Sequence, residues 1–189
     1  MSRAWICDIL PDMGTPRRMN GFQKERKMDY GIFAQMAEGT WKIEEGETRK
    51  DFMKRTFLAV CSGEETGGQR IINDMMAATL EDCDPDAGTL ALSFRVEDWM
   101  RNPMGTMHGG LLTTCVDLTI GTLTRFLRGG GHVSTVTLNM NFQRPVPYGE
   151  TVVIEARMDK NGGRVAFLGA NGFLKEGHKP CCRATGIFM

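Results

Sequence analysis

The sequence predicts an α+β domain in which an antiparallel sheet wraps around one long helix. The first observation behind this prediction is a stretch of low charge: between Arg101 and Arg125 the only formal charge is Asp117. A helix this apolar on most of its sides is a buried helix rather than a surface one. The second observation is the order of the elements, with two candidate strands before this helix and four after it. An antiparallel sheet that curls around the helix would cover it on nearly all sides.

Length and composition limit the number of domains and the class of partner. A chain of 189 residues, 41% of them hydrophobic, is long enough for one domain with an extension and has enough apolar side chains for a core. Lys and Arg together number 23, as do Asp and Glu, and the two signs are interspersed along the chain. Because this pattern contains no basic stripe, it argues against nucleic acid as a partner.

The first part of the chain, residues 1–69, is predicted to be a partly helical N-terminal extension. It is polar, charged and rich in Gly and Met, with short amphipathic helices expected over residues 21–37 and 47–61. We expect this arm to pack on the main domain or on a partner subunit, and its sequence assigns it no chemistry. The main domain is predicted over residues 70–189.

Two strands are predicted before the apolar helix. Residues 71–81 begin as an apolar stretch and are predicted to become a strand, and residues 84–88 (DPDAG) have the residue types of a turn. Residues 89–96 then alternate as a half-buried strand should. The apolar residues of one parity in that strand are Leu90, Leu92, Phe94 and Val96.

The helix itself is predicted over residues 109–128, where a glycine pair opens it and the glycines at 129–131 end it. The next strand candidate, residues 135–142, alternates apolar and polar residues without a fault, which places Thr135 on the polar face. A hairpin loop is expected at residues 159–163 (DKNGG). The three remaining strands are predicted at residues 151–158, 164–173 and 181–188.

The six cysteines are predicted to be reduced thiols rather than metal ligands. None forms a C-x-x-C pair, and zinc sites favour such short paired loops. Cys181 and Cys182 are adjacent, so on a regular strand they cannot both face one core. The first residues fail as a signal peptide because Asp8 interrupts a very short apolar run, and no apolar run approaches the ~18 residues of a membrane span. The sequence therefore predicts a cytoplasmic protein with no metal site and no membrane partner.

Asp117 is the residue of the apolar helix that most needs an explanation. A carboxylate in such a helix costs free energy unless it is hydrogen-bonded, paired or neutral, and acids kept at such a cost tend to be functional. Two turns earlier, the N–H groups at Gly109 and Gly110 lie at the helix start, where the helix dipole favours negative charge. Because glycine has no side chain, a carbonyl oxygen has room to approach these N–H groups closely.

This arrangement resembles the hotdog fold, and more narrowly the acyl-CoA thioesterases of the phenylacetate-pathway (PaaI-like) type in the 4-hydroxybenzoyl-CoA thioesterase superfamily. The resemblance rests on the stretch NPMGTMHGG that begins at Asn102, on Asp117 nine residues after His108, and on the order of the strands that follow. It covers about residues 70–189, and the N-terminal extension lies outside it.

The resemblance implies hydrolysis of an acyl-CoA thioester, with no cofactor required because coenzyme A is part of the substrate. It implies that Asp117 is the general base or nucleophile and that the Gly109 N–H donates to the oxyanion. Asn102 and His108 would position substrate or water, and Thr135 falls where a hydroxyl residue supports the acid. The resemblance also implies a homodimer or a homotetramer with active sites where two subunits meet.

Three further residues are expected to contact coenzyme A. Gly110 lies beside Gly109 at the helix start, where an acyl carbonyl would approach. Lys160 and Arg164 flank the tip of the predicted hairpin, a position from which they would reach phosphate groups. Exposed basic residues more often meet only water, so this expectation competes with a plain surface role.

Two alternatives to hydrolysis stay open. A non-catalytic acyl-CoA-binding module would use the same pocket, but it would not need Asp117. A hotdog dehydratase acting on 3-hydroxyacyl thioesters would pair a His with a Glu or Asp in a local pattern that His108 and its glycines do not match well. Medium-chain and aryl acyl groups are both candidates, and the missing basic patch favours coenzyme A over an acidic acyl-carrier protein.

Overall fold

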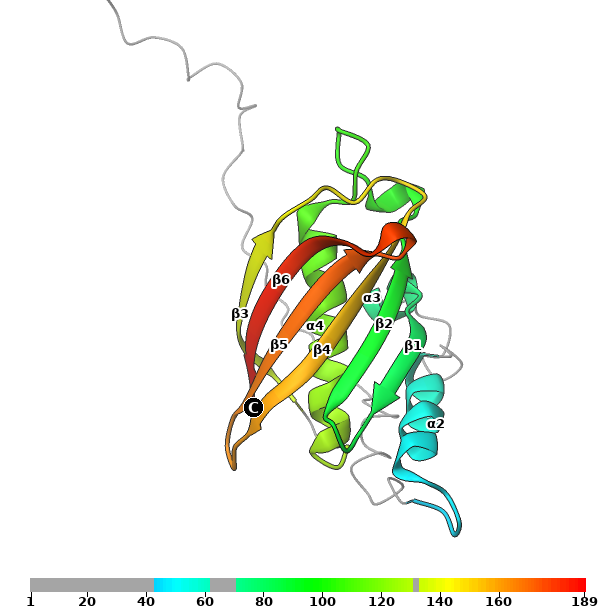
Figure 1. Ribbon diagram of the computed structural model, residues 1–189, viewed down its shortest axis with the longest axis vertical. Coiled ribbons are helices and arrows are strands. Elements are labelled where there is room, and N and C mark those ends of the chain that lie inside the picture. The colour runs from blue at the N-terminus through cyan, green and yellow to red at the C-terminus, as the bar shows by residue number, and fades with distance from the viewer. Residues whose placement is uncertain (1–42, 62–70, 131–132) are drawn as a thin grey trace, which may run out of the picture. The chain divides into compact units, whose positions relative to one another are not determined.

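The computed structural model describes residues 43–61, 71–130 and 133–189, with the backbone alone for residues 58–61. Its centre is a six-stranded antiparallel sheet with the strand order β1-β2-β4-β5-β6-β3. The long helix α4 (Gly109–Leu127) packs on one face of this sheet and lies behind it in Figure 1. The predicted α+β architecture, one antiparallel sheet around one central helix, is therefore confirmed.

Most elements occupy the ranges that the sequence predicts. In the described part of the chain, the helices α2 (Arg49–Cys61) and α3 (Ile72–Met76) come before the first strand. The helix predicted at residues 21–37 and the domain boundary predicted after residue 69 lie outside the described residues. The strands are β1 (Thr79–Asp84), β2 (Thr89–Arg95), β3 (Thr135–Phe142), β4 (Thr151–Asn161), β5 (Ala166–Leu174) and β6 (Lys179–Phe188).

Two boundaries differ from the prediction. The apolar stretch after residue 71 forms the short helix α3 before it becomes β1, because the Asp74 carboxylate accepts a hydrogen bond from the Ile71 N–H and so caps a helical turn. The hairpin loop is also shorter than expected, since β4 continues to Asn161. The turn closes where the Gly162 N–H donates to the Val165 carbonyl at 3.0 Å.

The adjacent cysteines correct a second expectation, because Cys181 and Cys182 are both buried. The register between β5 and β6 shifts at this point: Cys182 pairs with Gly172, and Pro180 pairs with Phe173. Cys181 is thus the extra residue of a β-bulge, and a bulge breaks the alternation on which the prediction relied. The hydrogen bond with Cys181 and burial both raise the pKa of the Cys182 thiol, so it stays protonated and packs as a small apolar group.

The core forms where the curved sheet meets α4. The residues of β2 expected on one face, Leu90, Leu92 and Phe94, are all buried. They belong to one core cluster with Val116, Ile120 and Leu123 of α4. Burying each such side chain contributes about 1.5–3 kcal/mol, so this contact fixes the helix against the sheet.

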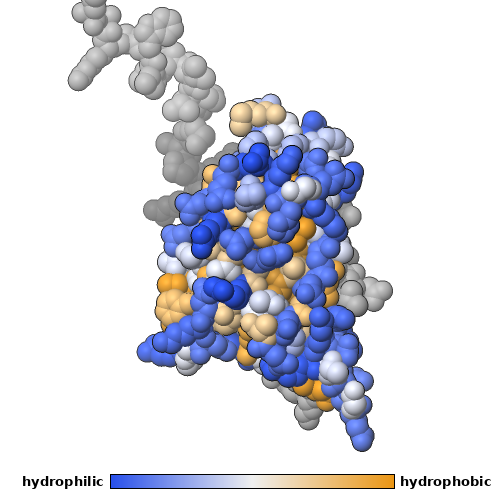
Figure 2. Space-filling view, viewed as in Figure 1, coloured by the Kyte–Doolittle hydropathy of each residue, from blue (hydrophilic) through white to orange (hydrophobic). Residues whose placement is uncertain are grey.

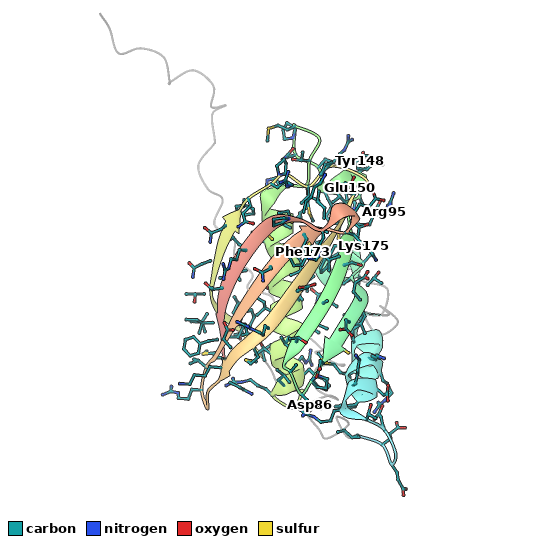
Figure 3. All side chains as sticks on the ribbon, in the orientation of Figure 1. Asp86, Arg95, Tyr148, Glu150, Phe173 and Lys175 are labelled. Carbon is teal, nitrogen blue, oxygen red and sulfur yellow. The ribbon has the colours of Figure 1, made fainter. Side chains whose placement is uncertain are left out.

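Helix α2 of the N-terminal arm packs beside β1 at one end of the sheet (Figure 1). The ring of Phe52 lies 5.4 Å from that of Phe126 in α4, measured between centroids. The charged side chains of α2 reach the hairpin between β1 and β2. There Arg49 pairs with Asp86, which is labelled at this end of the sheet in Figure 3. Exposed ion pairs contribute at most about 1 kcal/mol, so apolar contacts do most to hold α2 in place.

The outer face of the sheet, turned toward the reader in Figure 2, is mostly hydrophilic. Strand β3 is an edge strand, and its apolar side chains Val136 and Phe142 are 50% and 56% exposed. The alternation of this strand predicts a buried apolar face: Leu138 and Met140 pack against the core, but Val136 and Phe142 stay exposed in the single chain. Among the described helices, none is both long and apolar enough to cross a membrane.

Gly172→Ala is expected to lower the free energy of unfolding by about 1–3 kcal/mol, because overpacking of a close-packed core costs that much. A Cβ at this position would lie 2.5 Å from the Cys182 Sγ and 2.9 Å from the Ile154 Cδ1. The matched control is Gly169→Ala in the same strand, whose Cβ would lie 3.4 Å from the end of the Asp159 side chain. Urea unfolding of the wild type and the two variants measures the effect. Equal stability of the two variants would show that the residues around the bulge move to accommodate the added methyl group.

Candidate functional site

The start of α4 is capped by a histidine side chain. His108 is the N-cap residue, with an extended backbone (ψ 132°), and its Nδ1 accepts a hydrogen bond from the Gly110 N–H at 3.0 Å. A ring nitrogen that accepts is unprotonated, so in the neutral ring the proton is on Nε2. His108 therefore stabilises the first turn of the helix as its N-cap.

This cap leaves one backbone donor of the helix start exposed to a ligand. The first four N–H groups of an α-helix have no partner within the helix. Here the Gly110 N–H goes to the His108 ring, and the N–H groups of Leu111 and Leu112 go to the His108 carbonyl. Within the described part of the chain, no group accepts a hydrogen bond from the Gly109 N–H. This N–H lies at the positive end of a 19-residue helix, which favours an anionic acceptor.

Asn102 shapes the loop that leads into the helix. Its Oδ1 accepts from the N–H groups of Met104 and Thr106, and its Nδ2 donates to the Thr106 hydroxyl at 2.9 Å. These bonds form a turn of the kind that asparagine favours. The His108 N–H then donates to the Met100 carbonyl, which fixes where the helix begins. In this chain Asn102 thus contacts the loop and not Asp117, and its predicted contact with substrate remains a prediction.

Asp117 follows the buried Val116 in α4 and is itself partly exposed. The Thr135 hydroxyl donates to its Oδ1 at 2.8 Å. Simple alternation puts Thr135 on a polar face with no evident route to Asp117. The structure resolves this with a register shift between Thr135 and Thr137, where a β-bulge turns the first residue of β3 toward the helix. The predicted pair of acid and supporting hydroxyl is therefore in place within one chain.

A pocket of about 240 Å³ opens beside Asp117 and Thr135. It lies between α4 and α2, so the N-terminal arm forms one of its walls. The expectation that the arm packs on the main domain or on a partner subunit did not include this position, because the contact joins segments far apart in the chain. The other lining residues are Met53, Thr56, Phe57, Asn73, Leu90, Leu118, Gly121, Thr122, Arg125, Phe126, Val133 and Phe188.

Gly109 and Asp117 are too far apart in one chain to act on the same carbonyl. They are eight residues apart on one straight helix, which at 1.5 Å per residue is about 12 Å along the axis. A thioester carbon needs its oxyanion donor and its nucleophile or base each about 3 Å away. The two groups therefore meet at one reacting centre only if they come from different copies of the chain.

The basic residues predicted to bind coenzyme A lie near the other end of α4. Lys160 and Arg164 are exposed at the β4–β5 hairpin. Arg128, the residue after α4, clamps this hairpin by donating to the carbonyls of Gly162 at 2.7 Å and of Arg164 at 3.4 Å. Gly109 and Arg128 are separated by the full length of the helix, so a single chain does not bring Lys160 and Arg164 to the helix start. Over residues 43–61, 71–130 and 133–189, no cluster of three His, Cys, Asp or Glu side chains is arranged to hold a metal ion.

Comparison with known proteins decides the family. The model of the thioesterase superfamily matches residues 104–181, the segment that holds the helix start and Asp117. The Pseudomonas aeruginosa protein PA0474, named provisionally as an esterase, is 33% identical over 100 residues, which are 52% of this chain and 73% of that protein. The chain belongs to the thioesterase superfamily. The bovine (Bos taurus) acyl-coenzyme A thioesterase THEM4 is 36% identical over 96 residues, 51% of this chain. That match spans only 38% of the length of THEM4.

Solved structures of other proteins have the same fold. The Escherichia coli PaaI protein of the phenylacetic acid degradation operon superposes with a TM-score of 0.63 over 75% of this chain and 94% of its own, at 15% identity. A Streptococcus mutans protein bound to acetyl CoA superposes with a TM-score of 0.56 over 67% of this chain and 95% of its own, at 17% identity. The predicted hotdog fold and its PaaI-like form are thereby confirmed.

Proposed function

We propose that this thioesterase-superfamily chain hydrolyses an acyl-CoA thioester to the free acid and coenzyme A. Two features carry the proposal: a Gly109 N–H at a helix start with no acceptor among the described residues, and a carboxylate, Asp117, held by a hydroxyl beside a pocket. Membership of the family and the names of relatives such as THEM4 support the same activity.

The chemistry follows from what each group offers. The Gly109 N–H donates to the carbonyl oxygen as it becomes an oxyanion, and one such donor contributes about 3 kcal/mol to the transition state. The Asp117 carboxylate either takes a proton from the attacking water or attacks the thioester carbon itself. The carbon–sulfur bond breaks, coenzyme A leaves as the thiol, and water supplies the hydroxyl of the acid. Thr135 orients Asp117, and no cofactor is required.

The active unit we propose is a homodimer, alone or paired into a homotetramer. Three features support it. The 12 Å of helix between Gly109 and Asp117 requires a second copy to complete the site. The edge strand β3 presents the exposed side chains Val136 and Phe142, and an unpaired apolar edge favours pairing with another strand. The side of α4 that carries Asp117 also remains partly exposed in the single chain.

Two further expectations belong to this proposal. Lys160 and Arg164 of one subunit, with Gly110 at the helix start, would contact coenzyme A, whose phosphates attract exposed basic side chains. The cytoplasm is the compartment we propose, since the cysteines of the described residues are free thiols: Cys83, Cys115, Cys181 and Cys182.

Asp117→Asn is expected to lower kcat for acyl-CoA hydrolysis by about 10²–10⁴-fold, because the amide is neither a base nor a nucleophile. Steady-state release of coenzyme A from a panel of acyl-CoAs measures this. Asp159→Asn, an exposed acid on the outer face of the sheet, is the matched control and should keep wild-type rates. Equal rates for wild type and Asp117→Asn would remove this residue from the mechanism, and tight binding without turnover in wild type would favour a binding module.

Gly109→Pro is expected to lower kcat by about 10²–10³-fold, because it deletes the oxyanion donor. The backbone accepts this change: proline is favoured at the first helical position, and the ψ of 132° at His108 suits a residue before proline. Gly109→Ala is the control, since it keeps the N–H and its Cβ would lie 3.6 Å from the Phe142 ring, an ordinary contact. If the proline variant folds and both variants keep the wild-type rate, the N–H has no catalytic role.

A further inference from the structure

The pocket beside Asp117 extends along α4 toward a second charged residue. Asp117, Gly121 and Arg125 all line it. They are spaced four residues apart, so they form one stripe on the helix surface, and about 12 Å of helix axis separates the two charges. An acyl group whose thioester carbon lies at Asp117 would therefore point its far end toward Arg125.

Gly121 widens the middle of this stripe at a cost to the helix. A glycine inside a helix is less stable than alanine by about 0.5–1 kcal/mol. A Cβ on Gly121 would meet only the Phe188 ring, at 3.5 Å, which is an ordinary contact. Packing of the described chain therefore does not require glycine here, and the missing side chain leaves space in the pocket instead.

The walls around this stripe are largely apolar. Met53 and Phe57 of α2 line one side, and Leu118, Phe126 and Phe188 line others. A volume of about 240 Å³ is below the ≈ 300–1,000 Å³ of pockets for drug-sized ligands, so it suits an acyl group and not the whole of coenzyme A.

Arg125 brings a cation to this apolar pocket. It is half-buried, and its Nε donates to the Gly130 carbonyl at 3.2 Å. This burial lowers the pKa of its guanidinium, and partial exclusion of water strengthens a pair with an anion. A guanidinium has five N–H donors in a planar fork, so it is able to hold several acceptors at once, a carboxylate among them.

We propose that Arg125 is a specificity-determining residue that selects acyl groups of medium length ending in a carboxylate. The substrate class is then an ω-carboxyacyl-CoA, with the thioester at Asp117, the methylene chain between α2 and Gly121, and the distal carboxylate on Arg125. This inference rests on the proposed function for its reaction, but the preference it states also applies to binding alone.

The test compares octanedioyl-CoA with octanoyl-CoA, which differ only in the terminal carboxylate. The wild-type kcat/KM is expected to be about tenfold higher for octanedioyl-CoA, the value of one hydrogen-bonded charge pair. Arg125→Met should abolish this preference, and Arg125→Lys should keep part of it. Arg128→Met removes a charge from the end of the same helix but outside the pocket lining, so it should leave the ratio unchanged.

Binding of the two non-hydrolysable thioether analogues, measured by calorimetry, separates this inference from the proposed function. If neither thioester is hydrolysed, the proposed function fails, while the ratio of the two Kd values still decides the role of Arg125. No preference in wild type, or the same preference in Arg125→Met, overturns the inference.

Gly121→Ala tests the path of the chain without touching either charge. The added methyl should narrow the pocket and shift the preference from octanedioyl-CoA toward shorter diacids, while the more helix-prone alanine raises the Tm. An unchanged chain-length profile would show that the acyl group does not pass Gly121.

Discussion

The packing of α4 against the sheet is the constraint on which the rest of this structure depends. Val116, Ile120 and Leu123 bury one side of the helix with the core residues of the sheet. That burial fixes the direction of the helix, and with it the position of the Gly109 N–H at its start. It also leaves Asp117 on a flank of the helix, partly exposed and within reach of Thr135 in β3.

A rigid helix then sets the distance between the two groups to which we assign the reaction. About 12 Å separates Gly109 from Asp117 along the axis, and side-chain motion does not close such a gap between a backbone N–H and a carboxylate. The dimer that we propose would resolve the problem by bringing the helix start of one copy to the acid of the other. The exposed edge strand β3, whose Thr135 holds Asp117, lies on the side where such a contact would form.

The sequence predicts the elements well where one physical signal dominates. The alternation of Leu90, Leu92 and Phe94 identifies β2, and the lack of charge around Asp117 identifies α4. The two side-chain directions that alternation misplaces come from β-bulges, at Val136 and at Cys181, where one extra residue reverses the parity.

The wall of the pocket lay beyond prediction for a different reason. The contact of α2 with α4 joins residues such as Phe52 and Phe126 that are distant in sequence, and no local pattern encodes which helix covers which. Arg125 did carry a signal, since it is the next charge after Asp117 and falls on the same stripe of the helix. Recognising it as a pocket residue required knowing that α2 covers that stripe.

The most direct test of the shared site is complementation between two inactive variants. Asp117→Asn and Gly109→Pro are co-expressed with different tags, and the heterodimer that carries both tags is isolated. In a two-fold dimer this heterodimer has one site with both changes and one site with neither, so it should recover about half of the wild-type activity. A heterodimer no more active than either variant alone would contradict a site built from Asp117 of one copy and Gly109 of the other.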